Sequence, residues 1–101
     1  MRRITLALAL TAFSQHAFAA DHAVEIKGMK FVPAALEIAA GDTITFTNAD
    51  AAPHTATAGD GAFDTGRLKK GESKQVTVAA AGDHDFKCLV HPMMKGKVTA
   101  K

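Results

Sequence analysis

The sequence contains only one cysteine, Cys88, among its 101 residues. An internal disulfide needs two cysteines, so this kind of cross-link cannot stabilise the chain. A domain of this size buries a modest core and gains from an added stabilising group such as a bound metal. A single thiol in an oxidising, exported setting needs a reason to stay unpaired, and metal ligation is such a reason.

The chain also lacks an apolar run long enough to cross a bilayer as a helix. Its longest apolar stretch, Ile4 to Phe13, is too short for a span. Two arginines precede this stretch, and the small-x-small sequence Ala17-Phe18-Ala19 follows it. Residues 1–19 are therefore predicted to be a secretory signal peptide, and residues 20–101 the exported domain without a membrane anchor.

The predicted mature domain has no excess of charge of either sign. The full chain carries 12 basic and 10 acidic residues, and Arg2 and Arg3 of the leader are two of the basic ones. Basic and acidic residues are then equal in number, so no overall positive field attracts nucleic acid or anionic lipid. Lys69-Lys70 and Lys95-Gly96-Lys97 are short basic segments that we expect to be solvated faces.

No segment has the periodicity of a stable helix, and the sequence shows no internal repeat. Ala79-Ala80-Ala81 ends at Gly82 and is too short to nucleate a helix alone. Elsewhere apolar and polar residues alternate between turn signals about every ten residues, which is typical of an all-β sandwich or barrel. The expected strands or extended pieces cover residues 23–27, 29–33, 36–38, 43–47, 63–66, 75–78, 84–88 and 95–100.

Soft and borderline metal ligands gather in the loop Cys88-Leu89-Val90-His91-Pro92-Met93-Met94. Thiolate, imidazole and thioether groups together suit copper better than magnesium or calcium. His54, in a distant loop, is the candidate for a second imidazole. Two His and one Cys with a weak axial Met form the ligand set of a blue copper electron-transfer site, with Met93 or Met94 as the axial residue. The alternative is a structural cysteine with the methionines as core filler.

These motifs resemble the cupredoxins, and among them the amicyanins. The resemblance spans nearly all of residues 20–101, and the two-residue spacing between His91 and Met94 is that of the short amicyanin loop. The matching segments are Met29-Lys30-Phe31 with Pro33, Gly41-Asp42-Thr43-Ile44-Thr45-Phe46, Pro53-His54, and Cys88-x-x-His91-Pro92-x-Met94-Lys95-Gly96-Lys97-Val98.

The resemblance implies a Greek-key β-sandwich of about seven to eight strands that binds one type 1 copper ion. It implies His54, Cys88 and His91 as strong ligands and Met94 as the axial ligand, with Met93 exposed nearby. It also implies a periplasmic one-electron carrier that cycles between Cu(II) and Cu(I) and is not an enzyme. A periplasmic copper-binding or delivery protein is the alternative, although the open Met- and His-rich stretches of such proteins are absent from the sequence.

The same resemblance implies protein partners for the metal site. Amicyanins typically accept electrons from a dehydrogenase, methylamine dehydrogenase, and pass them to a c-type cytochrome. In cupredoxins the C-terminal histidine ligand reaches the surface through an apolar patch. The domain is expected to be a monomer that binds no nucleic acid and no membrane. Around His91 the patch would comprise Ala52, Pro53, Val90, Pro92, Met93 and Met29.

Val90 stands where amicyanins usually have proline. Unlike proline it offers a backbone N–H, which we expect to donate a second hydrogen bond to the Cys88 sulfur and to favour Cu(I). The other expected donor to this sulfur is the N–H of Thr55. Asn48 is a further candidate, as a brace for the loop that carries His54.

Two other histidines are expected to lie outside the metal site. His84 shares a strand face with Phe86 and Cys88 by alternation, and we expect it to be structural or solvated. His22 is expected to be a solvated terminal residue. Cleavage after Ala19 would instead expose the amine of Ala20-Asp21-His22, a sequence that can wrap Cu(II) or Ni(II) through nitrogen atoms.

Overall fold

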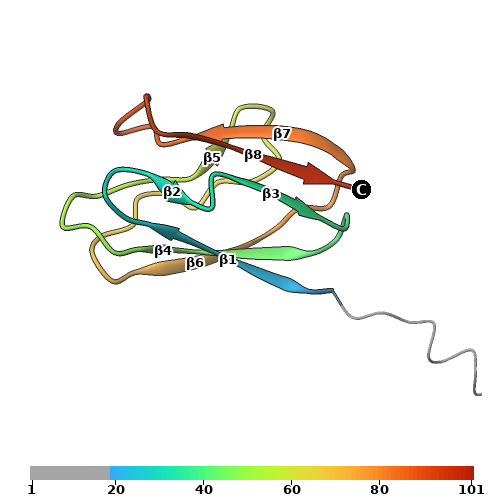
Figure 1. Ribbon diagram of the computed structural model, residues 1–101, viewed down its shortest axis with the longest axis horizontal. Coiled ribbons are helices and arrows are strands. Elements are labelled where there is room, and N and C mark those ends of the chain that lie inside the picture. Colours follow the sequence, from blue (N-terminus) through green and yellow to red (C-terminus); the bar gives the residue numbers. More distant parts are fainter. Residues whose placement is uncertain (1–18) are drawn as a thin grey trace, which may run out of the picture.

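The chain folds into two packed β-sheets, which Figure 1 shows from the side. The computed structural model describes residues 19–101, so the predicted leader of residues 1–19 lies almost wholly outside the described residues. None of the elements in the described part is a helix long and apolar enough to cross a membrane. The strands are β1 (Asp21–Ile26), β2 (Phe31–Val32), β3 (Ala35–Ile38), β4 (Thr43–Asn48), β5 (Thr57–Ala58), β6 (Ser73–Thr77), β7 (Gly82–Lys87) and β8 (Lys95–Ala100).

Each sheet has four strands and mixes parallel with antiparallel pairs. The strand orders are β2-β1-β4-β6 and β3-β8-β7-β5. The β1–β4 and β3–β8 pairs are parallel and the others antiparallel. The prediction of an all-β sandwich of seven to eight strands is confirmed. Connections 27–30, 49–56, 66–72 and 88–94 meet at the left in Figure 1, and we call this the loop end.

Alternation along the strands builds the core between the sheets. In β4 the side chains of Ile44 and Phe46 are buried, whereas the threonines between them are half-buried on the outer face. Four phenylalanine rings interlock at the centre, with centroids of neighbouring rings 4.7 to 6.3 Å apart. Such aromatic pairs contribute about 0.5–1.5 kcal/mol each beyond their burial. Gly96 lies opposite Phe86 in β8, where a Cβ would collide with the Phe86 ring.

The short extended piece expected at residues 63–66 is not a strand, which corrects the prediction. Asp64 makes only an isolated bridge with Thr57. Its Oδ1 accepts hydrogen bonds from the Thr57 hydroxyl and from the Gly66 N–H, and these local bonds hold the segment as a turn. The remaining strand is instead β5, which pairs with β7 on the side away from β8 and, at two residues, is too short to show alternation.

His84 is buried on β7, and both of its ring nitrogens face acceptors. Nδ1 lies 2.6 Å from Asp60 Oδ2, and Nε2 lies 2.8 Å from the carbonyl oxygen of Ala80. A carbonyl oxygen and an ionised carboxylate can only accept, so both nitrogens carry protons when both bonds are made. The Ala80 carbonyl, followed by the Asp60 carboxylate, raises the pKa of His84. The imidazole therefore ties two preceding turns, at Asp60 and at Ala80, to β7, in the structural role expected from the sequence.

Raising the pH should weaken this tie. Because the pKa of His84 is raised in the folded protein, its contribution to stability is complete below the ordinary histidine pKa of about 6.5 and is lost as pH rises through the raised value. We expect the free energy of unfolding, measured by urea denaturation, to fall by about 1 kcal/mol as pH rises from the ordinary histidine pKa to above the raised pKa. This is the typical contribution of one hydrogen bond. A His84→Gln variant should show no such fall over the same range. An equal fall in that variant would assign the pH dependence to another group.

Candidate metal centre

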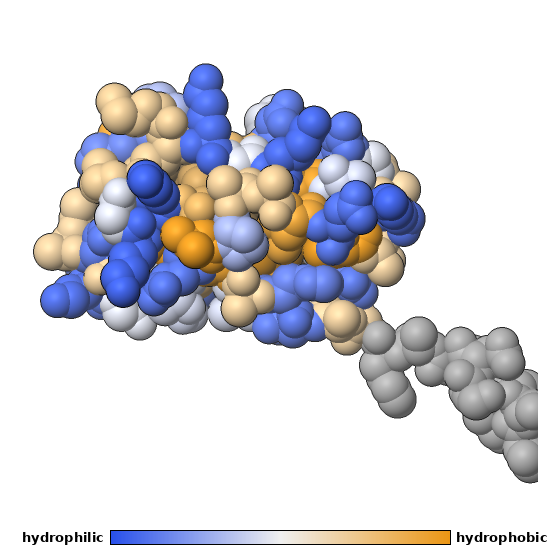
Figure 2. All heavy atoms as spheres, in the orientation of Figure 1, coloured by the Kyte–Doolittle hydropathy of each residue, from blue (hydrophilic) through white to orange (hydrophobic). Residues whose placement is uncertain are grey.

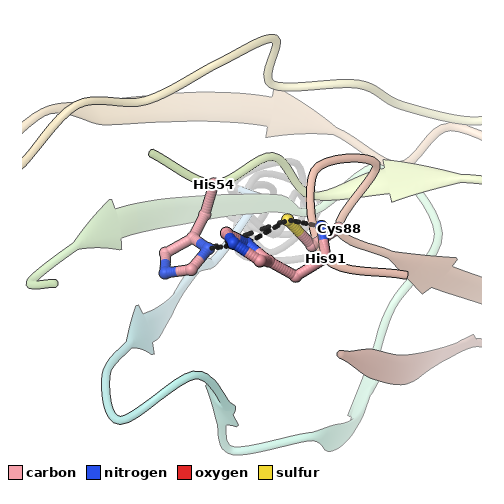
Figure 3. Close-up of side chains that lie close together, drawn as sticks. All are labelled: His54, Cys88 and His91. Carbon is pink, nitrogen blue, oxygen red and sulfur yellow. Dashed lines mark hydrogen bonds between the residues drawn. The ribbon is translucent and has the colours of Figure 1, made fainter. Parts of the chain in front are cut away.

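Three of the predicted ligands converge at the loop end. Cys88 Sγ lies 3.7 Å from His54 Nδ1 and 3.9 Å from His91 Nδ1, and the two Nδ1 atoms are 3.2 Å apart. Figure 3 shows the two imidazole rings and the thiol turned toward one another. The side chains of His54 and Cys88 are fully buried, whereas His91 is half-buried. These three residues form a cluster that could hold a metal ion.

The dimensions of this cluster fit a single small metal ion. The point equidistant from three atoms with these separations lies about 2.1 Å from each, close to the ~2.0–2.3 Å of bonds from zinc to imidazole nitrogen and thiolate sulfur. A trigonal set of two His and one Cys is the arrangement that blue copper proteins use. Without a metal the two lone-pair-bearing nitrogens and the sulfur would face one another in a buried space, which is unfavourable.

The loop between β7 and β8 brings two of these residues together. Cys88 directly follows β7, and its N–H donates to the carbonyl oxygen of Met94 at 3.0 Å. The N–H of Met94 in turn donates to the carbonyl oxygen of His91 at 2.9 Å. These bonds close the loop and turn the His91 ring back toward the cysteine. The two methionines separate clearly, because Met94 is buried and Met93 is 84% exposed.

His54 is held from both directions by backbone and side-chain bonds. Its N–H and carbonyl pair with those of Leu68 at 3.1 and 2.7 Å. The fully buried Asn48 amide donates to the carbonyl oxygens of Ala52 and Leu68, both at 2.8 Å, and its Oδ1 accepts the N–H of Asp50. Asn48 thus braces this loop, as the sequence suggested.

The Cys88 sulfur accepts two backbone hydrogen bonds. The Thr55 N–H donates at 3.4 Å, as expected, and the second donor is the N–H of His91 at 3.3 Å. The expectation that Val90 supplies this second bond is therefore wrong. The loop turns so that the amide three residues after the cysteine meets the sulfur, and Val90 instead packs half-buried against the core. Both bonds withdraw electron density from the thiolate.

A row of hydroxyl groups links the cysteine loop to the surface. The Leu89 N–H donates to Thr55 Oγ1 at 2.9 Å, and Thr55 Oγ1 lies 2.9 Å from Thr57 Oγ1. The Thr57 hydroxyl donates to Asp64 Oδ1, so the Thr55 hydroxyl is the one that donates between the two threonines. This row ties the start of the loop to β5 and to the turn at Asp64.

Asp50 is a residue at this centre that the sequence analysis did not single out. Its Oδ2 lies 3.0 Å from His54 Nε2, and its two oxygens also accept the N–H groups of Gly28 and Met29 at 2.9 Å. The Met29 and Gly28 amides, and then His54, lower the pKa of the Asp50 carboxyl. A carboxylate on Nε2 holds that proton there and leaves Nδ1 free for a metal. The only sequence signal was an acid four residues before a histidine.

The other two histidines of the described chain lie apart from this cluster. His84 bonds to Asp60 and Ala80, as above. His22 lies in β1, and its Nε2 is 2.9 Å from Asp42 Oδ2. Asp42 Oδ1 also accepts the backbone N–H of Ala20 at 3.0 Å. In this fold the His22 side chain therefore has a carboxylate partner. His22 is also the partner of Ile44 in the parallel pairing of β1 with β4.

Comparisons with known proteins agree with this geometry. The cupredoxin-like domain family matches residues 2–100. Amicyanin-alpha of Methylorubrum extorquens is 34% identical over 119 aligned residues, with full coverage of both chains. Amicyanin of Paracoccus denitrificans is 34% identical over 83 residues, a match that covers 77% of this chain and 63% of that protein.

Solved structures agree as well. The copper(I) form of an amicyanin mutant superposes with a TM-score of 0.72 at 34% identity, covering 87% of this chain and 88% of that one. A copper-containing nitrite reductase from Thermus scotoductus superposes with a TM-score of 0.73 at 30% identity, covering 80% of this chain but 22% of the reductase.

One buried cysteine and two imidazoles come together at the loop end of a β-sandwich. This combination is that of a small metalloprotein with one type 1 copper ion. The family match and the amicyanin relatives place it more narrowly. The chain belongs to the cupredoxin family and is amicyanin-like.

Removing the Asp50 carboxylate should weaken copper binding. In an Asp50→Ala variant the His54 imidazole loses the acceptor that orients it, and a loss of this kind typically lowers metal affinity roughly 10–100-fold. Chelator competition for Cu(II) measures this affinity. Asp83→Ala, which removes an exposed carboxylate on β7, is the control and should leave the affinity unchanged. Equal affinities of both variants and the parent protein would show that Asp50 does not position His54.

Proposed function

We propose that this protein is an exported one-electron carrier of the periplasm, with His54, Cys88 and His91 as strong copper ligands and Met94 as the axial ligand. The observation that carries the proposal is the triangle of Cys88 Sγ and the two Nδ1 atoms, in which Cys88 and His54 are fully buried. Bound copper supplies one-electron exchange between Cu(II) and Cu(I). The amicyanin relatives and structures support a cupredoxin electron carrier.

The protein frame suits this role because it limits movement of the ligands. Cys88 is anchored between two N–H donors and the Met94 carbonyl, and His54 is paired with Leu68 and held by Asp50. Ligands fixed in this way cannot rearrange much when the charge at the centre changes. A small rearrangement lowers the energy needed for each electron transfer, which favours rapid exchange.

The same burial favours a carrier over a copper-delivery protein. A delivery site must release its metal to another protein, so its ligands have to be reachable. Here His54 and Cys88 are both 0% exposed, and only the half-buried His91 approaches solvent. The site therefore gives an electron an outlet through His91 while it keeps the metal enclosed.

Exposed apolar side chains accompany this outlet. Met93 is 84%, Leu89 54% and Met29 42% exposed, and two of them flank His91 in its loop. An apolar surface of this kind suits brief redox encounters, which typically bury less than ~1,200 Å² in total. By resemblance the partners are a dehydrogenase donor and a c-type cytochrome acceptor, and the carrier itself is a monomer.

Methionine variants test the ligand assignment. Met94→Leu should shift the intense blue absorption band and raise the reduction potential, because the weak axial thioether is lost. Met93→Leu is the matched control, since it changes an exposed side chain one residue away and should leave the spectrum unchanged. Cys88→Ser should abolish the blue band. A spectrum altered by Met93→Leu and not by Met94→Leu would reverse the axial assignment, and a colourless Cu(II)-loaded parent would contradict the proposed function.

Processing of the chain tests the proposed export. Intact-mass measurement of the protein made in a Gram-negative host should show a chain that begins at Ala20 and is recovered in the periplasmic fraction. Introducing a charge into the apolar stretch of the leader, as in Leu8→Arg, should keep the full chain in the cytoplasm. Recovery of uncleaved parent protein from the cytoplasm would argue against a periplasmic carrier.

A further inference from the structure

Basic and acidic residues are equal in number in residues 20–101, but the fold distributes them unevenly over the domain. The connections at the loop end and the strand residues next to them hold most of the cations. Lys27 and Lys30 flank the segment that bonds to Asp50, and Lys87 and Lys95 flank the Cys88–Met94 loop. The exposed cations there are Lys27, Lys30, Arg67, Lys69, Lys70, Lys87 and Lys95.

The basic segment 67–70 lies at this end because of a single backbone pair. Leu68 exchanges two hydrogen bonds with His54, so its neighbours Arg67 and Lys69 stand beside the metal cluster. Arg67 and Lys69 are separated from His54 by more than ten residues of the chain. Only the fold brings the two segments close together. Lys69 and Lys70 are exposed, as expected from the sequence, and the fold places them at the loop end.

Few acidic groups offset these cations at the loop end. Asp50 is engaged by His54 and two amides, and the Glu72 carboxylate accepts the Lys69 N–H. Within residues 19–101 the lysine ion pairs join Lys97 to Asp83 at 3.5 Å and Lys101 to Glu37 at 3.4 Å. Neither of these lysines is one of the loop-end cations. The loop end thus carries net positive charge, and the balancing acids lie elsewhere on the domain.

The loop-end cations lie close in sequence to the apolar side chains beside His91. Met93, Leu89 and Met29 are exposed, and each lies within a few residues of a loop-end lysine. Figure 2 shows pale orange, mildly hydrophobic residues together with deep blue hydrophilic ones at this end, on the left of the view. An apolar centre with a charged rim is the usual anatomy of a protein–protein interface, and the rim charges chiefly set the association rate.

We propose that the loop end docks an acidic redox partner protein, with carboxylates of the partner facing the lysines around its own redox centre. This inference rests on the proposed function and adds the chemistry of the partner. Single-stranded nucleic acid is disfavoured because such sites use exposed aromatic rings, whereas the chain has no Trp or Tyr and the four Phe of residues 19–101 are buried. The small apolar centre beside a single outlet favours a protein over a lipid surface.

The rate of electron transfer to charged oxidants tests whether the loop end carries net positive charge. The copper(I) protein is mixed in a stopped-flow instrument with hexacyanoferrate(III), which takes one electron and becomes hexacyanoferrate(II) as Cu(I) becomes Cu(II). Between about 10 and 300 mM salt the Debye length shrinks from ~30 Å to below ~10 Å. We expect the rate to fall about tenfold over this range. The cationic oxidant tris(phenanthroline)cobalt(III) should show a rate that rises with salt.

Two charge-matched variants locate the effect. Lys69→Glu with Lys70→Glu changes the loop end, and Lys97→Glu with Lys101→Glu makes the same change in net charge where lysines are already ion-paired. We expect the first pair to lose most of the salt dependence with hexacyanoferrate(III) and the second to retain it. Soluble poly-L-glutamate should slow oxidation of the parent and of the second variant but not of the first.

The outcomes separate this inference from the proposed function. Suppose that the parent protein shows the blue band and a reversible potential. If both variants then show equal salt dependence, or if salt changes the rate in the same direction with both oxidants, the inference is overturned and the carrier function still stands. Absence of the blue band would count against the carrier function itself. Co-sedimentation with phosphatidylserine-containing vesicles, abolished by the first variant only, would identify a membrane as the occupant and overturn the protein partner.

Discussion

The structure depends on holding a sulfur and two imidazole nitrogens 3.2 to 3.9 Å apart, with Cys88 and His54 fully buried and His91 half-buried. Bringing three such groups together is costly, because each gives up hydrogen bonds to water as it is buried, and a shared cation would offset this cost. The two N–H donors to Cys88 and the carboxylate on His54 satisfy the atoms that face away from the metal. The sandwich keeps this arrangement together through the phenylalanine core beneath it.

The polar network around His54 explains how a loop can be as well fixed as a strand. Asn48 ends β4 with its amide and carbonyl all bonded to backbone, and the Leu68 backbone pairs with His54 from the other side. A buried polar network adds rigidity when each member is satisfied and would be costly if one partner were missing. Asp50 extends the network to the β1–β2 connection, so four segments of the chain meet around His54.

The proposed function follows from the contrast between the enclosed proposed ligands and the exposed surface beside them. Two of the proposed ligands, His54 and Cys88, are fully buried and give the centre a fixed geometry, while the half-buried His91 lies in a loop with exposed apolar side chains. The lysines that the fold gathers around this edge add a long-range attraction that the total charge of the chain conceals. A shuttle benefits from both, because apolar contact permits a short encounter and charge speeds its formation.

Much of the fold and of the candidate metal site can be predicted from the sequence, because the patterns that indicate them are local. The sequence located seven of the strands, most of them by alternation, since period-two burial is a property of neighbouring residues, and the Cys88–Met94 spacing indicated the proposed ligand loop. Tertiary structure decided what depends on distant segments. Only the fold shows that His91 rather than Val90 donates to the sulfur, that Asp50 meets His54, and that residues 67–70 stand beside the metal cluster. These outcomes are set by how loops from two sheets pack against one another, which no pattern within a single segment encodes.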